Sequence, residues 1–430
     1  MGQEIANNPD ASLPEQMGSW GDLKAAYRLL NEEDVTHKAL SQGHWLQTRQ
    51  QAAMTEARVV LFVQDTTELD YTRQVKTKNL GHIGDGKGRG LMLHSCLAVV
   101  PQPGNPEIIG LAAQEVWRPE QIKRGSETRT QRAYRRTQSD VWAEIVEAIG
   151  VAIAARNTTN LVSVGDRGSD VFSYIRRATA INWNCLIRVC QDRVIHTVDG
   201  VKGRLLSFVR SVPAMASKSI VLRGRDGEPK RSVNLLVAWS KVLIFPPTRG
   251  PERRTQPISC WCMRVWEATD SPDALEWVLL TTVPISDTNC ALLQVDWYAV
   301  RWVIEEYHKC LKTGCAVEQR QLTTAAGLER FLGFLAIVAV KLLQLRTLSR
   351  SHPKHLASSV VPLIMLKVLI ARLGLLKWEL TLAEFWRGLA RLGGFIGRKS
   401  DGNPGWQTLW RGWSRLQDMS WGASLALEAF

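Results

Sequence analysis

The stretch Arg58-Val-Val-Leu-Phe-Val-Gln-Asp-Thr-Thr67 decides the fold of this chain. Its apolar run is continuous and rich in β-branched residues, which is typical of a strand buried on both faces. The run ends in polar residues, so the pattern predicts that Asp65 stands at the exit of a buried strand. A strand end holds a carboxylate rigidly, as a catalytic site requires, although a single aspartate there is more often a turn residue.

The segment that follows predicts a three-stranded meander with this first strand. Its signals are a glycine-rich turn at residues 81–90, an apolar run at 91–100, a Pro/Gly/Asn cluster at 101–106 and a second apolar run at 108–116. A long helix is expected from about Arg132 to Ala155. The glycine-rich turn lacks the Gly-Lys-Ser/Thr ending of a nucleotide-binding loop, so Lys87 and Arg89 are interpreted as contacts to a DNA backbone or as a solvated turn.

A second buried-strand pattern also delivers an aspartate at its end. Asn160-Leu-Val-Ser-Val-Gly-Asp166 repeats the arrangement of the first strand. By itself Asp166 would serve equally well as the cap of a helix that starts near Ser169. Strand, meander, helix and strand together indicate a mixed α/β fold.

The helix predicted to begin near Val295 has one polar face and one apolar face. At about 100° per residue, one arc contains Tyr298, Arg301, Glu305, His308, Lys309 and Lys312. The opposite side contains Val300, Val303, Ile304, Tyr307 and Leu311. A charged helix face is usually only solvated, but one acid among several bases suits a site that holds phosphates and a metal ion.

Asp65, Asp166 and Glu305 together suit phosphoryl transfer with two metal ions. Transfer of a phosphodiester needs charge neutralised on the attacking and the leaving oxygen, which two Mg²⁺ or Mn²⁺ ions about 3.5 to 4 Å apart achieve. Hard cations prefer oxygen ligands, and Mg²⁺ usually takes one or two carboxylates. Three carboxylates are therefore enough to seat two ions while DNA completes their shells.

Composition favours nucleic acid as the partner. Lys and Arg number 54 against 41 Asp and Glu, which gives a net charge of +13. The apolar runs at residues 331–340 and 363–376 are shorter than the roughly 18 to 20 residues that span a bilayer, and no secretory signal is present, so we expect a cytoplasmic protein without a membrane partner. Eight cysteines without a Cys-x-x-Cys pair indicate reduced, mostly buried thiols rather than a zinc site.

Three motifs resemble those of bacterial DDE transposases of the insertion-sequence-four family, the group that includes the transposon-five transposase. They are Gln64-Asp-Thr-Thr-Glu-Leu-Asp-Tyr71, Val164-Gly-Asp-Arg-Gly-Ser-Asp170 and the spacing Tyr298-x2-Arg301-x3-Glu305-x6-Lys312. The tail Leu409-Trp-Arg-Gly-Trp413 is also similar to that of the family. The resemblance covers nearly the whole chain.

The resemblance implies an RNase H-like mixed-sheet core with a β-rich insertion and helical regions at both ends. The regions are an N-terminal helical DNA-binding region at residues 1–57, the first part of the catalytic core at 58–192, the insertion at 193–285, the second part of the core at 286–350 and a C-terminal dimerisation region at 351–430. Asp65, Asp166 and Glu305 would bind two Mg²⁺ or Mn²⁺ ions.

The resemblance also implies the DNA contacts. Tyr298, Arg301 and Lys312 would contact the phosphates of the transposon end, with His308 and Lys309 beside them on the same face. Trp277 matches a residue that stacks on a flipped base, and Arg188 matches an arginine that contacts DNA; a core tryptophan is the simpler interpretation of Trp277. A stacking platform of this kind is worth about 1 to 3 kcal/mol per base.

The activity implied is cut-and-paste transposition. Double-stranded DNA with terminal inverted repeats would be nicked, joined into a hairpin and opened, and its 3′ ends would be transferred into target DNA by a homodimer. Two departures leave alternatives open: the second motif has Gly-Ser where the family often has Glu-Ala, and the helical segment before Trp20 is shorter than is usual in the family. The alternatives are a non-catalytic or inhibitory partner of a full-length transposase and an RNase H-like metal-dependent nuclease.

Overall fold

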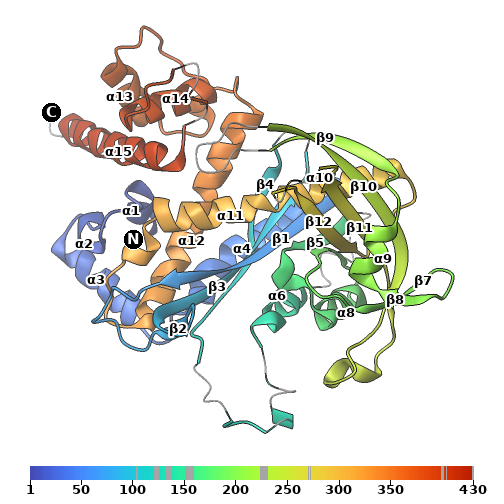
Figure 1. Cartoon of the computed structure of the whole chain (residues 1–430). Helices are drawn as coiled ribbons and strands as arrows, with labels where there is room; N and C mark the ends of the chain where they lie inside the picture. The colour runs from blue at the N-terminus through green and yellow to red at the C-terminus, as the bar shows by residue number, and fades with distance from the viewer. Residues whose placement is uncertain are drawn as a thin grey trace.

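One mixed sheet runs through the middle of the protein, and helices from both ends of the chain flank it (Figure 1). The computed structural model describes residues 1–102, 105–120, 125–128, 130–131, 135, 137–150, 159–222, 231–269, 271, 273–398, 401–402 and 404–428. The mixed α/β architecture predicted from the sequence is confirmed.

The central strands follow the predicted order. Strands β1 (Val59–Asp70), β3 (Gly88–Val100) and β4 (Glu107–Trp117) form the antiparallel meander. Strand β5 (Asn160–Gly165) pairs parallel to β1, and β6 (Asn184–Arg188) pairs parallel to β5. The short strand β2 (Gly81–Ile83) forms a hairpin with the start of β3. The order across this part of the sheet is β4-β3-β1-β5-β6.

Strand β1 is longer than the sequence predicted. Its parallel pairing with β5 ends at Val63 and Val164, but its antiparallel pairing with β3 continues to Asp70. The prediction that Asp65 ends the strand is therefore wrong. Asp65 instead lies in mid-strand, at the point where β1 loses its parallel neighbour, because β3 still satisfies the backbone there.

The predicted β-rich insertion extends the same sheet. Its strands are β7 (Val194–Thr197), β8 (Lys202–Arg204), β9 (Ala216–Leu222), β10 (Arg231–Ile244), β11 (Ile258–Glu267) and β12 (Glu276–Thr281). Strand β12 pairs antiparallel with β6, with Leu279 opposite Arg188, and β11 and β10 follow outward. Pairing with β12 provides hydrogen-bond partners for backbone N–H and C=O groups of β6, which would be unpaired if β6 were an edge strand. Helix α9 (Leu205–Ser211) lies within this region.

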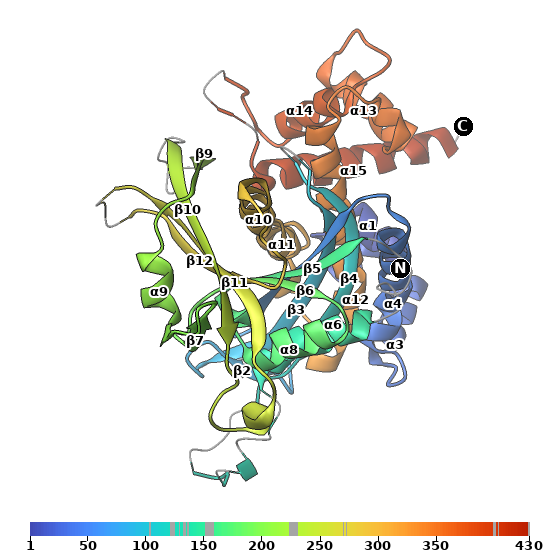
Figure 2. The ribbon, with the colours of Figure 1, turned by 90° about the vertical axis from the view of Figure 1, so that its right-hand side faces the viewer.

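Alternate residues of the central strands pack into two separate cores. On one face of β1, Leu61 and Val63 pack with α10 (Thr288–Val300), α11 (Trp302–Lys309) and α12 (Ala325–Ser351). On the other face, Val60 and Phe62 pack with α6 (Val141–Ile149) and α8 (Phe172–Ala180). Figure 2 shows the two groups of helices on opposite sides of the sheet. This period-2 separation is what a strand buried on both faces requires.

Helix α6 is shorter than predicted within the described residues. It ends at Gly150, whose φ of +82° favours glycine, and the 3-10 turn η1 (Gln138–Asp140) precedes it. The remaining parts of the predicted helix, residues 132–134, 136 and 151–155, lie outside the described residues.

The N-terminal region is helical, as predicted. It consists of α1 (Gly2–Asn7), α2 (Leu13–Gln16), α3 (Trp20–Asn31) and α4 (His37–Met54). In α3 the predicted apolar face is buried at Leu23, Ala26 and Leu30, while Tyr27 remains partly exposed. Helix α4 packs against β4 and α12, which joins this region to the sheet.

The C-terminal region is also helical. It follows α12 with α13 (Leu363–Leu373), α14 (Leu382–Leu392) and α15 (Trp406–Glu428). Among the described residues, α12 is the one helix long and apolar enough to cross a membrane by length and composition, which the sequence analysis did not expect. It packs against α4 and β4, and 61% of its apolar stretch is buried, as in the core helix of a folded domain.

Candidate active site

Asp65 lies on β1, and Asp166 directly follows the adjacent parallel strand β5. Val63 lies opposite Val164 in the β1–β5 register, and Asp65 and Asp166 each follow two residues after these partners. The register therefore brings both residues to the same part of the sheet, where the charge of Asp166 acts on the Asp65 carboxyl. Asp166 also caps the 3-10 turn η2 (Arg167–Ser169), because its Oδ1 accepts a hydrogen bond of 2.8 Å from the backbone N–H of Gly168. The capping role considered from the sequence is therefore present beside the proposed one.

The carboxyl group of Asp65 has a strongly perturbed pKa. Burial raises its pKa to about 7, and the charge of Asp166 adds to this rise. Glu305 contributes in the same direction, whereas Arg301 and the backbone N–H of Thr66 oppose it. The charges of Asp166 and Glu305 thus both act on the Asp65 carboxyl.

Glu305 is paired with a basic side chain, that of Arg301. Its carboxylate forms an ion pair with Arg301, one helical turn earlier, and its side chain is 56% exposed. Burial alone would lower the pKa of the Arg301 guanidinium, but Tyr298, Glu305 and Asp65 raise it overall. Within the part of the chain that the structure describes, no group of three or more His, Cys, Asp or Glu side chains is arranged to hold a metal ion. Arg301 neutralises Glu305 in this arrangement.

An aromatic and basic corner adjoins these acids. The rings of Trp277 on β12 and Tyr298 on α10 meet edge to face with centroids 5.2 Å apart, and the Arg301 guanidinium lies 6.0 Å from the Tyr298 ring. Arg188 at the end of β6 donates a hydrogen bond of 3.2 Å to the carbonyl of Glu276, and burial lowers its pKa. Trp277 is half-buried, so it is neither the plain core tryptophan nor a fully open platform.

His308 differs from its prediction. The sequence places it on the open polar face, but its side chain is 6% exposed. Its Nε2 lies 3.2 Å from the hydroxyl of Ser95, and its Nδ1 lies 3.8 Å from Oδ2 of Asp65. Burial lowers the pKa of His308 to about 3, with Lys312 adding to the effect. The ring is therefore neutral and supports Asp65 from within, which does not suit a phosphate contact.

The two lysines of the helix have different surroundings. Lys309 is exposed, as predicted. Lys312 lies in the π-helical turn η4 (Cys310–Gly314) that ends the helix, and its Nζ is 3.3 Å from Oε1 of Glu318. The same Glu318 oxygen accepts a hydrogen bond of 3.0 Å from the backbone N–H of Asp70. Lys312 thus sits beside the far end of β1, and turns of this type are frequent at functional sites.

The β2–β3 hairpin carries Lys87 and Arg89. Lys87 is exposed at the tip and pairs loosely with Asp85 at 3.8 Å. Arg89 is half-buried, and its Nη2 donates a hydrogen bond of 2.6 Å to the carbonyl of Thr77. Of the two predicted DNA contacts, only Lys87 extends freely into solvent, because Arg89 holds the neighbouring loop.

A buried hydrogen-bond network beneath the acids was missed by the sequence analysis. Gln64 donates to the hydroxyl of Ser163 at 2.7 Å, while its Oε1 lies 2.8 Å from Nε2 of His94. Nδ1 of His94 is in turn 2.7 Å from the hydroxyl of Thr66. These side chains tie β1, β3 and β5 together around Asp65. The available signal was the presence of polar residues inside otherwise apolar strand runs, since buried polar groups need partners.

Asp170, the second acid of its motif, has a structural role. It is 1% exposed, and its Oδ2 accepts hydrogen bonds of 2.8 Å from the backbone N–H groups of Cys190 and Gln191. It also pairs with Arg193. These contacts fix the segment that leaves β6, next to Arg188.

Two segments of the chain match known transposase families. Residues 2–35 match a family described as "Transposase DNA-binding", and residues 338–428 match one described as "Transposase Tn5 dimerisation domain". These two matches support a Tn5-like transposase. The resemblance inferred from the sequence motifs is thereby confirmed, and its link to the insertion-sequence-four family is consistent with these matches. Along the chain, the first match covers α1 to α3, and the second covers the end of α12 through α15.

The chain is also similar to a solved transposase. The structure is a cryo-EM structure of a piggyBac transposase synaptic complex with hairpin DNA, with a TM-score of 0.35 and 11% sequence identity. The match covers 81% of this chain, and the chain spans 65% of the length of the piggyBac chain.

Proposed function

We propose that this Tn5-like transposase excises a DNA element and inserts it elsewhere, using one metal-dependent site for every step. One observation carries the proposal. Asp65 lies on β1 and Asp166 directly follows the adjacent parallel strand β5, and burial together with the charge of Asp166 raises the pKa of Asp65 to about 7. When two carboxylates each disfavour the ionised form of the other, a bound divalent cation stabilises the ionised pair. Carboxyl groups with strongly shifted pKa values are concentrated at functional sites. The mixed sheet that presents them supports an RNase H-like core.

The donor set fits Mg²⁺ or Mn²⁺. Asp65 and Asp166 would hold the ions, and Glu305 would join them after leaving its ion pair with Arg301. When bound, two such ions neutralise charge on the attacking and leaving oxygens of the phosphodiester. The released Arg301 then becomes available to bind a phosphate oxygen of the DNA, so that one rearrangement prepares both groups.

The surrounding residues would hold the DNA in place. We assign phosphate contacts to Arg301, Lys309, Lys312 and Arg188, with Lys87 reaching a more distant part of the backbone; Tyr298, which the sequence predicted as a phosphate contact, is only 4% exposed and would act through its neighbours Trp277 and Arg301. Trp277 would stack on a base turned out of the duplex during hairpin formation, with Tyr298 supporting its edge. The neutral His308 would keep Asp65 in place from the protein side. Nicking, hairpin formation, hairpin opening and strand transfer would then be successive displacements at this site, with water or a 3′-hydroxyl as nucleophile.

The end regions would supply the partners. Residues 2–35 match a DNA-binding family, so we propose that they bind the terminal inverted repeats. Residues 338–428 match a dimerisation family, so we propose a homodimer that pairs two transposon ends before attacking target DNA. The net charge of +13 suits such a complex. A protein with these partners would work in the bacterial cytoplasm, in association with the nucleoid.

The second candidate is a non-catalytic, inhibitory partner of another transposase. The observation in its favour is the ion pair of Glu305 with Arg301, together with the lack of a ready-made three-ligand group among the described residues. The nuclease alternative shares the site but predicts cutting without joining.

Purified full-length protein, paired transposon-end DNA and Mg²⁺ test these candidates. The transposase predicts double-strand cuts, hairpin products and joined strands; the inhibitor predicts none of them. Asp65→Asn, Asp166→Asn and Glu305→Gln should each abolish cleavage while DNA binding persists, and exposed Asp199 provides the control Asp199→Asn. Retained Mg²⁺-dependent cleavage in any one of the three would remove that residue from the site.

A further inference from the structure

The residue after Glu305 faces the opposite way, into the C-terminal helices. Glu306 forms an ion pair with Arg346 of α12, and the two side chains are only 17% and 8% exposed. The indole Nε1–H of Trp406, the first residue of α15, donates a hydrogen bond of 2.6 Å to Oε2 of Glu306. A buried carboxylate that accepts from both a guanidinium and an indole has a well-defined position.

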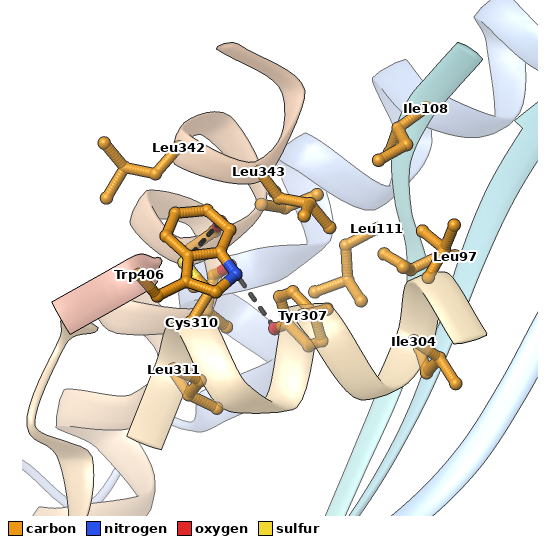
Figure 3. Packing of buried hydrophobic residues seen from close by; sticks show 14 of the residues in the cluster. Leu97, Ile108, Leu111, Ile304, Tyr307, Cys310, Leu311, Leu342, Leu343 and Trp406 are labelled. Carbon is orange, nitrogen blue, oxygen red and sulfur yellow. Dashed lines mark hydrogen bonds between the residues drawn. The ribbon is translucent and has the colours of Figure 1, made fainter. Parts of the chain in front are cut away.

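Trp406 is itself held on both sides. The Arg346 guanidinium lies 4.2 Å from its ring, and Trp410 stacks on it with centroids 5.5 Å apart and planes 12° from parallel. Figure 3 shows Trp406 within the buried cluster beside Cys310, Leu342 and Leu343.

Helix α15 also touches the turn that ends the Glu305 helix. Gly314 closes this π-helical turn, and a Cβ atom at that position would come within 2.0 Å of the Trp410 indole. The C-terminal region therefore contacts the Glu305 helix and its terminal turn at two points, Glu306 and, eight residues later, Gly314. Contacts at these two points limit rotation and translation of α11 relative to the C-terminal helices.

We propose that Glu306, Arg346 and Trp406 form a positioning cluster that sets the orientation of Glu305. The inference rests on the proposed metal-binding role of Glu305. Neighbouring residues of a helix move together, so a shift of α11 at Glu306 is passed directly to Glu305. A metal-binding side chain must be held within about 0.5 Å of its productive position, and partners behind the ligands usually provide that support.

The cluster also connects the C-terminal region with the Glu305 helix. Arg346 and Trp406 both lie in the segment that matches the dimerisation family. If these helices shift when two copies pair, the contact through Glu306 would carry that shift to Glu305.

The test uses full-length protein with two substitutions of different severity. Glu306→Gln removes the charge that Arg346 pairs with, while Trp406→Phe keeps an aromatic ring and removes only the N–H. Glu329→Gln is the matched control: Glu329 lies on α12, as Arg346 does, and makes a two-point ion pair with Arg118, at 2.6 and 2.9 Å. The primary readout is Mn²⁺ affinity in the presence of transposon-end DNA, followed by the EPR signal of free Mn²⁺. The Mg²⁺ concentration that gives half-maximal cleavage is the second readout.

Both cluster variants should bind Mn²⁺ about 10- to 100-fold more weakly, the usual effect of removing a partner behind a ligand, and high Mg²⁺ should restore cleavage. The control should match wild type in both measurements. Unchanged Mn²⁺ affinity in a folded Trp406→Phe protein would overturn the inference, as would lost cleavage that Mg²⁺ does not restore. Wild-type protein that binds Mn²⁺ through Asp65 but cuts no DNA would instead count against the proposed function.

Discussion

Removal of the Asp65 charge should stabilise the metal-free protein, and by more at high pH than at low pH. The pKa of Asp65 is about 7 in the folded protein against an ordinary value of 3.8. At about 1.4 kcal/mol per pH unit, this difference makes the ionised Asp65 cost about 4 kcal/mol of unfolding free energy. The side chain is only 18% exposed, so little of this figure is lost to solvent screening.

The sign follows from proton binding. Below pH 3.8 Asp65 is protonated in both the folded and the unfolded state, so it adds no pH dependence. Between about pH 4 and 7 the folded state holds a proton that the unfolded state has released, so stability falls as pH rises. Above pH 7 the full cost of about 4 kcal/mol applies, whereas at pH 5 it is about 1.6 kcal/mol.

Thermal unfolding of wild type and Asp65→Asn in EDTA measures this effect. The variant should unfold at a higher temperature, and its advantage should be larger at pH 8 than at pH 5. Addition of Mg²⁺ at pH 8 should stabilise wild type and leave the variant nearly unchanged, because the cation compensates the charge that the variant lacks. An equal advantage at both pH values, or a variant less stable than wild type at pH 8, would refute the reasoning about burial of this carboxyl.

Three further substitutions test separate parts of the structure. Gly314→Ala drives a methyl group into the Trp410 indole and should cost about 1 to 3 kcal/mol in thermal unfolding, while Gly203→Ala, with open space at its Cβ, should cost much less. Gln64→Ala leaves Ser163 and His94 without their buried partner and should cost about 1 to 3 kcal/mol at pH 7; a stability equal to wild type would mean that water replaces the amide. Trp277→Ala should slow hairpin formation about 5- to 150-fold, the equivalent of about 1 to 3 kcal/mol of base stacking, without slowing the first nick; equal slowing of both steps in a gel time course would assign Trp277 a structural role.

Much of the fold was predictable because it depends on neighbours in the chain. The apolar runs that became β1, β3, β4 and β5 are continuous and bounded by turn residues, so local pattern was sufficient to predict them. The helical periodicity at residues 295–312 correctly predicted that Ile304, Tyr307 and Leu311 enter the core, but it did not predict the burial of Tyr298 and His308. The motif acids Asp65 and Asp166 were likewise recognisable at the ends of parallel pairing.

The errors arose where pairing with a distant segment decides the outcome. Strand β1 continues past Asp65 because β3 remains beside it, and no residue near Asp65 encodes that length. His308 lies on the polar arc of its helix, but its imidazole is buried because Ser95 on β3 and Asp65 on β1 pack against it. The β-rich segment looked separate because β12 finds its partner β6 only in the folded chain.

The amino-acid sequence by itself determined the mixed α/β class of fold, predicted three candidate acids and indicated the family, because apolar periodicity and residue spacing are properties of short stretches. Only the tertiary structure decided how those acids are charged and held. Burial and the approach of Asp166 set the pKa of Asp65, Arg301 competes for Glu305, and the C-terminal helices grip Glu306. These effects depend on distances between groups up to 240 positions apart along the chain, as with Asp65 and Glu305, and such distances exist only after the chain has folded.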